Sequence, residues 1–423
     1  MDSLPERLAP PNWMTAPPTR SVLQALSAGG AVVRFVGGCV RDALLGLRPD
    51  DVDIATPETP DQVIRRLEKA KLKAVPTGID HGTVTAVLPP ATFQITTLRR
   101  DVVTDGRHAV VCFGTDWAED AKRRDFTINA LYADPDGRLH DFTNGRADLA
   151  AGIVRFIGDP AQRVAEDYLR VLRFFRFHAR FGKGAPHDAS LRACAAAADR
   201  LDRLSGERVR DELLKILALP NATEALALME RTGVLRALLP QARFDFERFG
   251  RLTNLQVLLT EQIGLEPEVW PRLAILFLDD ASEEKGALVA ERLKLSNAQR
   301  LRVEGLLAPR LFPREALLDR AAFGQALYRH GVERCRDHAL LAAVDDPDLK
   351  SAMLERAKDS AAWQRPVFPL RGADVLALGF APGPTVSALL NELEKWWADN
   401  GFMPDREACL TRLRERVRTS SQP

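Results

Sequence analysis

Residues 37–42 read Gly-Gly-Cys-Val-Arg-Asp, and residues 51–53 read Asp-Val-Asp. These stretches decide the fold of the N-terminal part, because an apolar, β-branched run at residues 32–36 precedes them and a helix is predicted over residues 43–47. The two glycines let the backbone approach a ligand closely, and helix N-terminal amides hold phosphate oxygens. Arg41 adds a planar donor fork that suits phosphate. The pattern predicts a phosphate-binding turn between a strand and a helix.

The second stretch carries a pair of carboxylates. Asp51 and Asp53 stand two apart in an extended segment, so both side chains point to one face of the strand. Carboxylates this close repel each other unless a cation is present, and hard oxygen ligands suit Mg²⁺. Two such ions clamp the attacking and leaving oxygens of an in-line phosphoryl displacement. An isolated Asp-x-Asp would favour a turn or a helix cap, but the neighbouring Gly-Gly turn and Arg41 favour a metal site.

Composition is typical of a soluble globular protein. The chain has 423 residues, enough for two to four domains, with 46% hydrophobic and 28% charged residues. No apolar run is long enough to span a bilayer, and the N-terminus does not resemble a signal peptide, so the cytoplasm is the expected compartment. The formal net charge of +1 means that any RNA-binding surface must come from local basic patches.

Secondary-structure patterns divide the chain near residue 158. Up to that point apolar, β-branched runs alternate with helical stretches, which predicts a small α/β unit. After Pro160 helix-period sequence rich in Leu, Ala, Arg and Glu continues almost to the end. The fold class is therefore predicted to be α+β, with a small α/β part followed by an all-helical part. A long segment between Leu98 and Trp117 is predicted to be a structureless functional loop.

Several motifs together resemble the class II tRNA nucleotidyltransferase and bacterial poly(A) polymerase family, within the DNA polymerase beta superfamily. In chain order they lie at residues 37–46, 51–56, 81–84, 96–99, 105–108, 123–130, 141–149, 154–158 and 166–173. The clear resemblance covers roughly residues 20 to 220, and its motifs occur in the family's order. Residues 378–384 and Trp396-Trp397 are similar to the tail of alphaproteobacterial and mitochondrial-type members.

The resemblance implies a nucleotidyltransferase head followed by a helical neck, body and tail. We predict these domains: an irregular lead-in at 1–20, the head at 21–158, the neck at 159–238, the body at 239–366 and an RNA-binding tail at 367–423. It implies template-independent addition of CCA to the 3′ acceptor end of tRNA from CTP and ATP, with two Mg²⁺ ions and release of pyrophosphate. No membrane and no obligate protein partner are expected.

The resemblance also assigns residues to the site. Asp51 and Asp53 are the implied catalytic and metal-binding residues. The nucleotide-binding residues are Gly37, Gly38, Arg41, Arg124, Asp167, Arg170, Arg173 and Arg176. One position departs from the family pattern, because Gln94 stands where the family usually has a glutamate that is often counted as a third acidic member. Gln94 accepts hydrogen bonds but carries no charge.

Base selection is predicted to rest on Asp167 and Arg170. They stand three apart in residues 166–176, a segment predicted to be helical, and so share a face. The pair presents an acceptor beside a donor, which matches the amino group and ring nitrogen of both cytosine and adenine. Uracil and guanine present the reverse order. Two unpaired groups at about 1–3 kcal/mol each predict a discrimination of roughly a hundredfold.

Other activities share these motifs. A poly(A) polymerase would use the same head, and a partial enzyme would add only CC or only A. The tail resemblance favours full CCA addition. A non-catalytic RNA-binding protein is the alternative of another class, and Gln94 is the feature that favours it.

Overall fold

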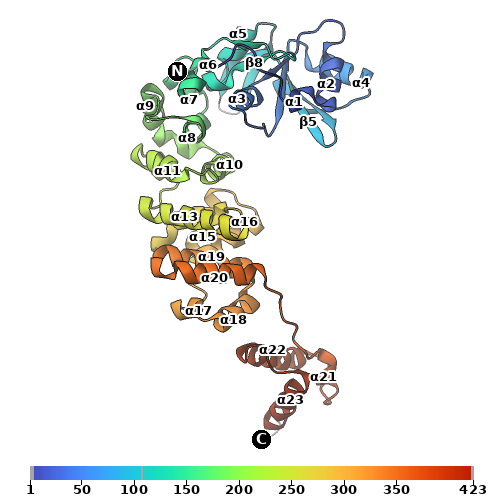
Figure 1. Cartoon of the computed structure of the whole chain (residues 1–423), viewed down its shortest axis with the longest axis vertical. Coiled ribbons are helices and arrows are strands. Elements are labelled where there is room, and N and C mark those ends of the chain that lie inside the picture. Colours follow the sequence, from blue (N-terminus) through green and yellow to red (C-terminus); the bar gives the residue numbers. More distant parts are fainter. Residues whose placement is uncertain (1–3, 106–107, 421–423) are drawn as a thin grey trace. The chain divides into compact units, whose positions relative to one another are not determined.

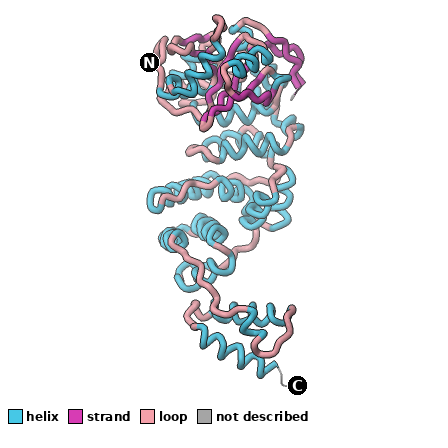
Figure 2. Tube along the Cα trace, turned by 90° about the vertical axis from the view of Figure 1, so that its right-hand side faces the viewer, coloured by secondary structure: helices cyan, strands magenta, loops and turns pink. Residues whose placement is uncertain are grey.

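The chain forms two compact units. The computed structural model describes residues 4–105 and 108–420, and the units comprise residues 1–242 and 243–423. Within the described residues, strands occur only in the first unit, and the second is built of helices and loops (Figures 1 and 2). None of the helices in this described part is long and apolar enough to cross a membrane. The predicted α+β class is confirmed.

A mixed seven-stranded sheet forms the centre of the head, in the order β3-β4-β5-β2-β1-β8-β9. Its strands are β1 (Arg34–Val36), β2 (Val52–Thr56), β3 (Lys73–Gly78), β4 (Thr83–Leu88), β5 (Ala91–Thr97), β8 (Leu131–Ala133) and β9 (Leu139–Asp141). Neighbours β2 and β5 are parallel, whereas the other neighbouring pairs are antiparallel. Fully buried Phe35, Ile54 and Ile95 place the hydrophobic core against the middle strands.

Of the next three helices of the head, two pack on the sheet and the third packs on one of those two. They are α2 (Pro17–Ser27), α3 (Gly38–Leu44) and α4 (Pro60–Lys69). Helix α4 begins at a capping box made by Thr59 and Gln62, and it buries Val63 and Leu67. Helix α3 packs on β1, β2 and β8, which fixes the start of the helix beside the start of β2.

Phenylalanines join the sheet to the helices that follow it. The remaining helices of the first unit are α5 (Trp117–Lys122), α6 (Gly145–Ala151), α7 (Pro160–Glu166), α8 (Leu169–Phe181), α9 (Asp188–Ala196), α10 (Gly206–Leu217), α11 (Ala222–Arg231) and α12 (Val234–Leu238). Phe126 stacks on Phe156 at 4.9 Å between ring centroids, and Phe174 stacks on Phe156 at 5.9 Å. Because Phe174 belongs to α8, the predicted head and neck share one core.

In its described residues, the second unit consists of helices joined by loops. Its helices are α13 (Phe246–Ile263), α14 (Val269–Ala274), α15 (Glu283–Arg292), α16 (Asn297–Leu307), α17 (Arg314–Leu318), α18 (Arg320–His330), α19 (Val332–Asp345), α20 (Lys350–Ala361), α21 (Gly372–Leu376), α22 (Pro384–Asp399) and α23 (Arg406–Ser420). Trp397 packs against Tyr328 at 5.8 Å and donates its indole N–H to the Pro404 carbonyl. The finer division into neck, body and tail stays a prediction.

Two expectations about irregular segments were wrong. Residues 1–20 are not irregular throughout, since α1 (Asn12–Thr15) and the start of α2 lie inside them. Proline at the first position of α2 suits a helix start, because its missing N–H would have no partner there. The segment between Leu98 and Trp117 contains the hairpin of β6 (Arg99–Asp105) and β7 (His108–Phe113), whereas Gly106 and Arg107 lie outside the described residues.

Candidate active site

A polar cavity of about 390 Å³ lies where α3, β2 and α8 meet. It gathers eight of the predicted site residues: Gly37, Gly38, Arg41, Asp51, Asp53, Arg124, Arg173 and Arg176. These residues come from four separate parts of the sequence, and only the fold brings them together. The other two predicted residues, Asp167 and Arg170, do not line this cavity.

The glycine turn forms the entry to α3. Gly37 has φ 76° and ψ −125°, a backbone conformation that side chains rarely adopt. Its N–H donates to the Leu131 carbonyl of β8 at 2.9 Å, which ties the turn to the sheet. Helix α3 starts at Gly38, five residues earlier than the predicted helix at 43–47. Its N-terminal end, with the N–H groups of the first turn, therefore lies at the cavity.

The two carboxylates differ in exposure. Asp51 is exposed immediately before β2, whereas Asp53 is partly buried within that strand. Burial raises the pKa of Asp53, the negative charge of Asp51 raises it further, and Arg124 opposes the shift. A divalent cation would relieve this repulsion. The described residues contain no group of three or more His, Cys, Asp or Glu side chains suited to a metal ion.

Gln94 occupies the neighbouring strand at the level of Asp53. In the parallel pairing of β2 with β5, Asp53 is the register partner of Gln94. Paired residues of neighbouring strands project to the same face of a sheet, so Gln94 stands beside Asp53 with an uncharged side chain. The strand register therefore agrees with the place at which the family resemblance puts a third acidic residue.

Substituting glutamate at this position gives a testable prediction. Gln94→Glu is expected to lower the Mg²⁺ concentration for half-maximal activity by about tenfold, because it adds a negative charge beside the carboxylate pair. The measurement is the rate of RNA extension as Mg²⁺ is titrated. Thr85→Glu is the control, since Thr85 pairs with Gln94 one strand farther from Asp53 and should have a smaller effect. If Gln94→Glu needs the same Mg²⁺ concentration as the parent for half-maximal activity, the prediction is wrong.

Each predicted arginine at the cavity already has a partner within the protein. Arg41 donates hydrogen bonds to Asp42 and Asn129, Arg124 to Asp120 and Tyr132, and Arg173 to Asp125, whereas Arg176 forms an ion pair with Glu212. Three of these guanidinium groups also lie over the Phe177 ring, at 5.2 Å for Arg41 and Arg173 and at 4.6 Å for Arg176. The pairs hold the guanidinium planes in fixed orientations around the cavity.

Asp125 is the carboxylate that links the head to α8. Its Oδ1 accepts the Phe126 N–H and the Asn129 amide, and its Oδ2 accepts Arg173 Nε at 2.8 Å. Burial would raise the pKa of Asp125, but the charge of Arg173 and these hydrogen bonds lower it to about 2. Asp125 therefore stays ionised and fixes Arg173 at the cavity.

The buried carboxylate of Asp120 should make the stability of the fold sensitive to acid. Burial would raise its pKa, but Arg124, Arg123 and the Tyr132 hydroxyl lower it to about 2. A carboxylate with a depressed folded pKa stabilises the protein above its unfolded pKa and loses that effect as pH falls. We expect Asp120 to contribute about 2 kcal/mol, lost between pH about 4 and about 2. Urea unfolding measured from pH 5 to pH 2 should show this loss, and Asp120→Asn should make the pH dependence shallower; an equally steep profile in the variant contradicts it.

The structure corrects the predicted base-selecting segment. Residues 166–176 are not one helix, because α7 ends at Glu166 and α8 begins at Leu169, with Asp167 extended between them. The Asp167 carboxylate accepts the Leu169 N–H and pairs with Arg208 at 2.8 Å. Arg170 bonds instead to Glu166 and to the Arg163 carbonyl. The extended backbone at Asp167 interrupts the helical spacing from which a shared face was inferred.

Sequence reasoning did not assign Asp42, Asp125, Phe177 and Arg180 to the site, although all four line the cavity. A signal existed for the last two, since residues 173, 177 and 180 recur on one face of a helix. Asp125 lies within the motif at residues 123–130, but its pairing with Arg173 could not be inferred, because Arg173 lies 48 residues away in the chain.

Comparisons with known proteins agree with this geometry. The chain matches the family described as "Poly A polymerase head domain" over residues 33–155. Residues 186–245 match "Probable RNA and SrmB- binding site of polymerase A". The chain is 35% identical over 402 residues to CCA tRNA nucleotidyltransferase 1, mitochondrial, of Mus musculus, an alignment that covers 94% of this chain and 89% of the mouse protein.

Bacterial relatives extend the match. The CCA-adding enzyme of Levilactobacillus brevis is 32% identical over 409 residues, which covers 92% of this chain and 95% of that protein. The crystal structure of the Bacillus stearothermophilus CCA-adding enzyme in complex with CTP has a TM-score of 0.65 and 27% identity, and the match covers 96% of this chain and 98% of that one. Because the relatives exceed 30% identity over most of their length, the chain belongs to the family of CCA-adding tRNA nucleotidyltransferases.

Proposed function

We propose that the protein adds CCA to the 3′ end of tRNA, using CTP and ATP without a nucleic-acid template. The observation that carries the proposal is the meeting of Asp51 and Asp53 with an arginine-lined cavity in a chain of this family. The crystal structure of one relative, a CCA-adding enzyme, contains CTP. The cytoplasm stays the expected compartment, although the mouse relative is named mitochondrial.

Asp51 and Asp53 fit the ligand set of Mg²⁺, with hard oxygen donors on one side of a strand. When bound, two such ions stabilise the charge that develops on the attacking and leaving oxygens. In the reaction, the 3′-oxygen of the RNA bonds to the α-phosphorus, the bond from that phosphorus to the pyrophosphate oxygen breaks, and the hydroxyl proton passes to solvent. Arg173 and Arg176 are placed to orient the nucleotide, since both line the cavity.

Base selection by Asp167 and Arg170 remains part of the proposal. In this conformation Arg208 and Glu166 hold the two side chains, so reading a base requires them to exchange these partners for the nucleotide. Asp167→Ala is expected to lower the selectivity against UTP and GTP by roughly tenfold, because one of the two base-reading groups, the acceptor for the base amino group, is gone. The ratio of kcat/KM for CTP and UTP measures it. A variant that discriminates as well as the parent contradicts the assignment.

One assay tests the function. The chain is incubated with Mg²⁺ and a tRNA that ends before its CCA, with CTP, ATP or both, and the product lengths are read on a gel. Three added nucleotides with both triphosphates support CCA addition. A long ladder with ATP alone identifies a poly(A) polymerase, which the match to the poly(A) polymerase head favours as the second candidate. Extension by CC or A alone identifies a partial enzyme, and no extension identifies a binding protein.

A further inference from the structure

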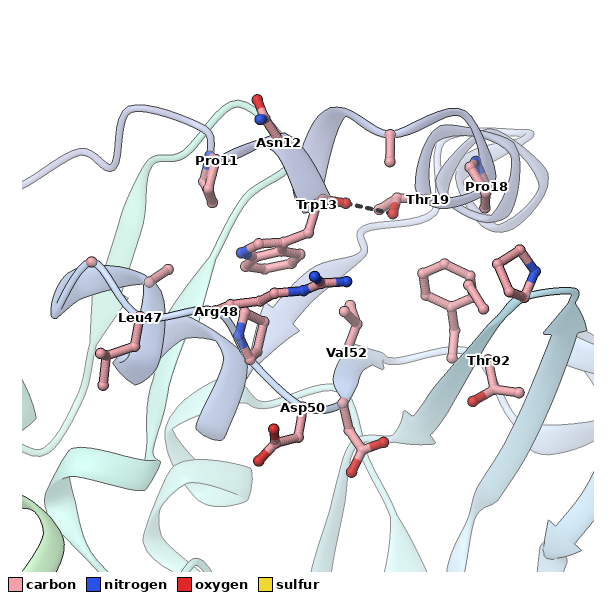
Figure 3. A pocket seen from close by; sticks show the side chains of 18 residues that line it. Pro11, Asn12, Trp13, Pro18, Thr19, Leu47, Arg48, Asp50, Val52 and Thr92 are labelled. Atoms are coloured by element: carbon pink, nitrogen blue, oxygen red, sulfur yellow. Dashed lines mark hydrogen bonds between the residues drawn. The ribbon is translucent and has the colours of Figure 1, made fainter. Parts of the chain in front are cut away.

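A second cavity adjoins the carboxylates and the proposed nucleotide site. Its volume is about 880 Å³, and residues before α2, after α3 and at the start of β5 line it. Pro49, Asp50 and Asp51 line both cavities, so the two spaces meet at the first catalytic carboxylate. Figure 3 shows Trp13 and Arg48 pointing into this space, with Asp50 below them.

Trp13 presents an anchored aromatic ring. Its centroid lies 5.0 Å from that of Phe35, with the planes at 83°, and Phe35 is fully buried in β1. The Trp13 carbonyl accepts the Thr19 hydroxyl at 2.6 Å, the dashed bond in Figure 3, which fixes α1 against α2. The indole N–H is buried and has no hydrogen-bond partner among the described residues. Trp13 is therefore held in place while its side chain still lines the cavity.

Arg48 differs from the arginines of the nucleotide cavity. It is exposed, and within the part of the chain that the structure describes it makes no hydrogen bond or ion pair, whereas Arg41, Arg124, Arg173 and Arg176 are all paired. An unpaired guanidinium beside an aromatic ring matches the two parts of a nucleotide, the phosphate and the base.

The reaction geometry selects which nucleotide this is. In an in-line displacement the attacking oxygen and the leaving pyrophosphate lie on opposite sides of the α-phosphorus. If the triphosphate occupies the arginine-lined cavity, the RNA approaches the α-phosphorus from the side away from the pyrophosphate, and the second cavity is another space that Asp51 lines. We propose that the second cavity holds the 3′-terminal nucleotide of the RNA, with its base stacked on Trp13 and its phosphate paired with Arg48. This inference rests on the proposed function.

A fluorescent tRNA tests the stacking directly. The full chain is mixed with a tRNA whose 3′-terminal base is 2-aminopurine, which loses fluorescence when it stacks on an aromatic ring. The wild-type chain should quench the probe, Trp13→Phe should keep most of the quenching, and Trp13→Leu should abolish it. Trp13→Leu should also raise the KM for the tRNA about tenfold while the KM for CTP stays unchanged, because one base stack is lost.

Arg48→Ala is a second variant that does not disturb the core. It should raise the KM for the tRNA severalfold and lower the slope of log Kd against log salt by about 1. Arg65→Ala is the matched control, since Arg65 is an exposed arginine of α4 that lines neither cavity.

Three outcomes overturn the inference: undiminished quenching by Trp13→Leu, a rise in the KM for CTP in place of that for tRNA, or equal effects of Arg48→Ala and Arg65→Ala. A wild-type chain that extends no tRNA overturns the proposed function instead, so the two failures are distinguishable.

Discussion

Asp53→Asn is expected to lower the rate of tRNA extension by at least about 10³-fold. Asparagine keeps the size of the side chain but removes the negative charge that, with Asp51, suits a divalent cation. Stabilisation of the transition-state charge by such ions is worth several kcal/mol, and each 1.36 kcal/mol corresponds to a factor of ten. The measurement is the single-turnover rate at saturating CTP, tRNA and Mg²⁺.

The matched control is Asp61→Asn, which neutralises an exposed aspartate in the first turn of α4. It should extend tRNA at the parental rate, because Asp61 lies outside both cavities. Full-speed extension by Asp53→Asn would falsify the assignment of the carboxylate pair and, with it, the proposed reaction.

Asp125→Ala is expected to lower the free energy of unfolding of the first unit by about 3 kcal/mol. Its side chain is only 12% exposed and accepts bonds from Arg173, Asn129 and the Phe126 N–H. Removing one partner of a buried pair leaves the other charge uncompensated, which costs about 3–5 kcal/mol in comparable cases. Urea unfolding at pH 7 measures the change.

A double-mutant cycle separates the ion pair from the general loss of packing. Arg173→Ala in the Asp125→Ala background should cost much less than in the parent, because the carboxylate it would orphan is already absent. Asp188→Ala is the control, since its pair with Arg192 is exposed and should add nothing measurable. If the losses of unfolding free energy in Asp125→Ala and Arg173→Ala simply add in the double variant, the pair does not couple the head to α8.

Much of the fold could be predicted from local pattern. The alternation of β-branched runs with helical stretches indicated the α/β head, and the leucine-rich periodicity indicated the helices that follow. The hairpin of β6 and β7 was missed because its strands pair only with each other, so nothing but their own valines marked them. Helix α1 and the first turn of α2 fall inside the proline-rich stretch that was expected to be irregular, although proline also starts helices.

The site was predictable to the extent that its residues lie in contiguous motifs. Gly37, Gly38, Asp51 and Asp53 could be identified from spacing alone, because a turn and one strand place them. The partners of the arginines could not, since Asp125 meets Arg173 only after α8 packs on the head. For Asp167 and Arg170 the sequence spacing was misleading. Their three-residue spacing suggested one shared helical face, but the helix is interrupted between Glu166 and Leu169.

The pairing of Arg41, Arg124, Arg173 and Arg176 with carboxylates of the protein has a consequence for ligand choice. Under the proposed function, a triphosphate that enters this cavity competes with carboxylates of the protein for guanidinium groups that these pairs already orient. Small inorganic anions offer too few simultaneous contacts to win that exchange, whereas a chain of three phosphates offers several at once. The arginine side chains lose little conformational entropy when a triphosphate binds them, because they are already held in place. The proposed site should therefore favour a triphosphate over sulfate or phosphate.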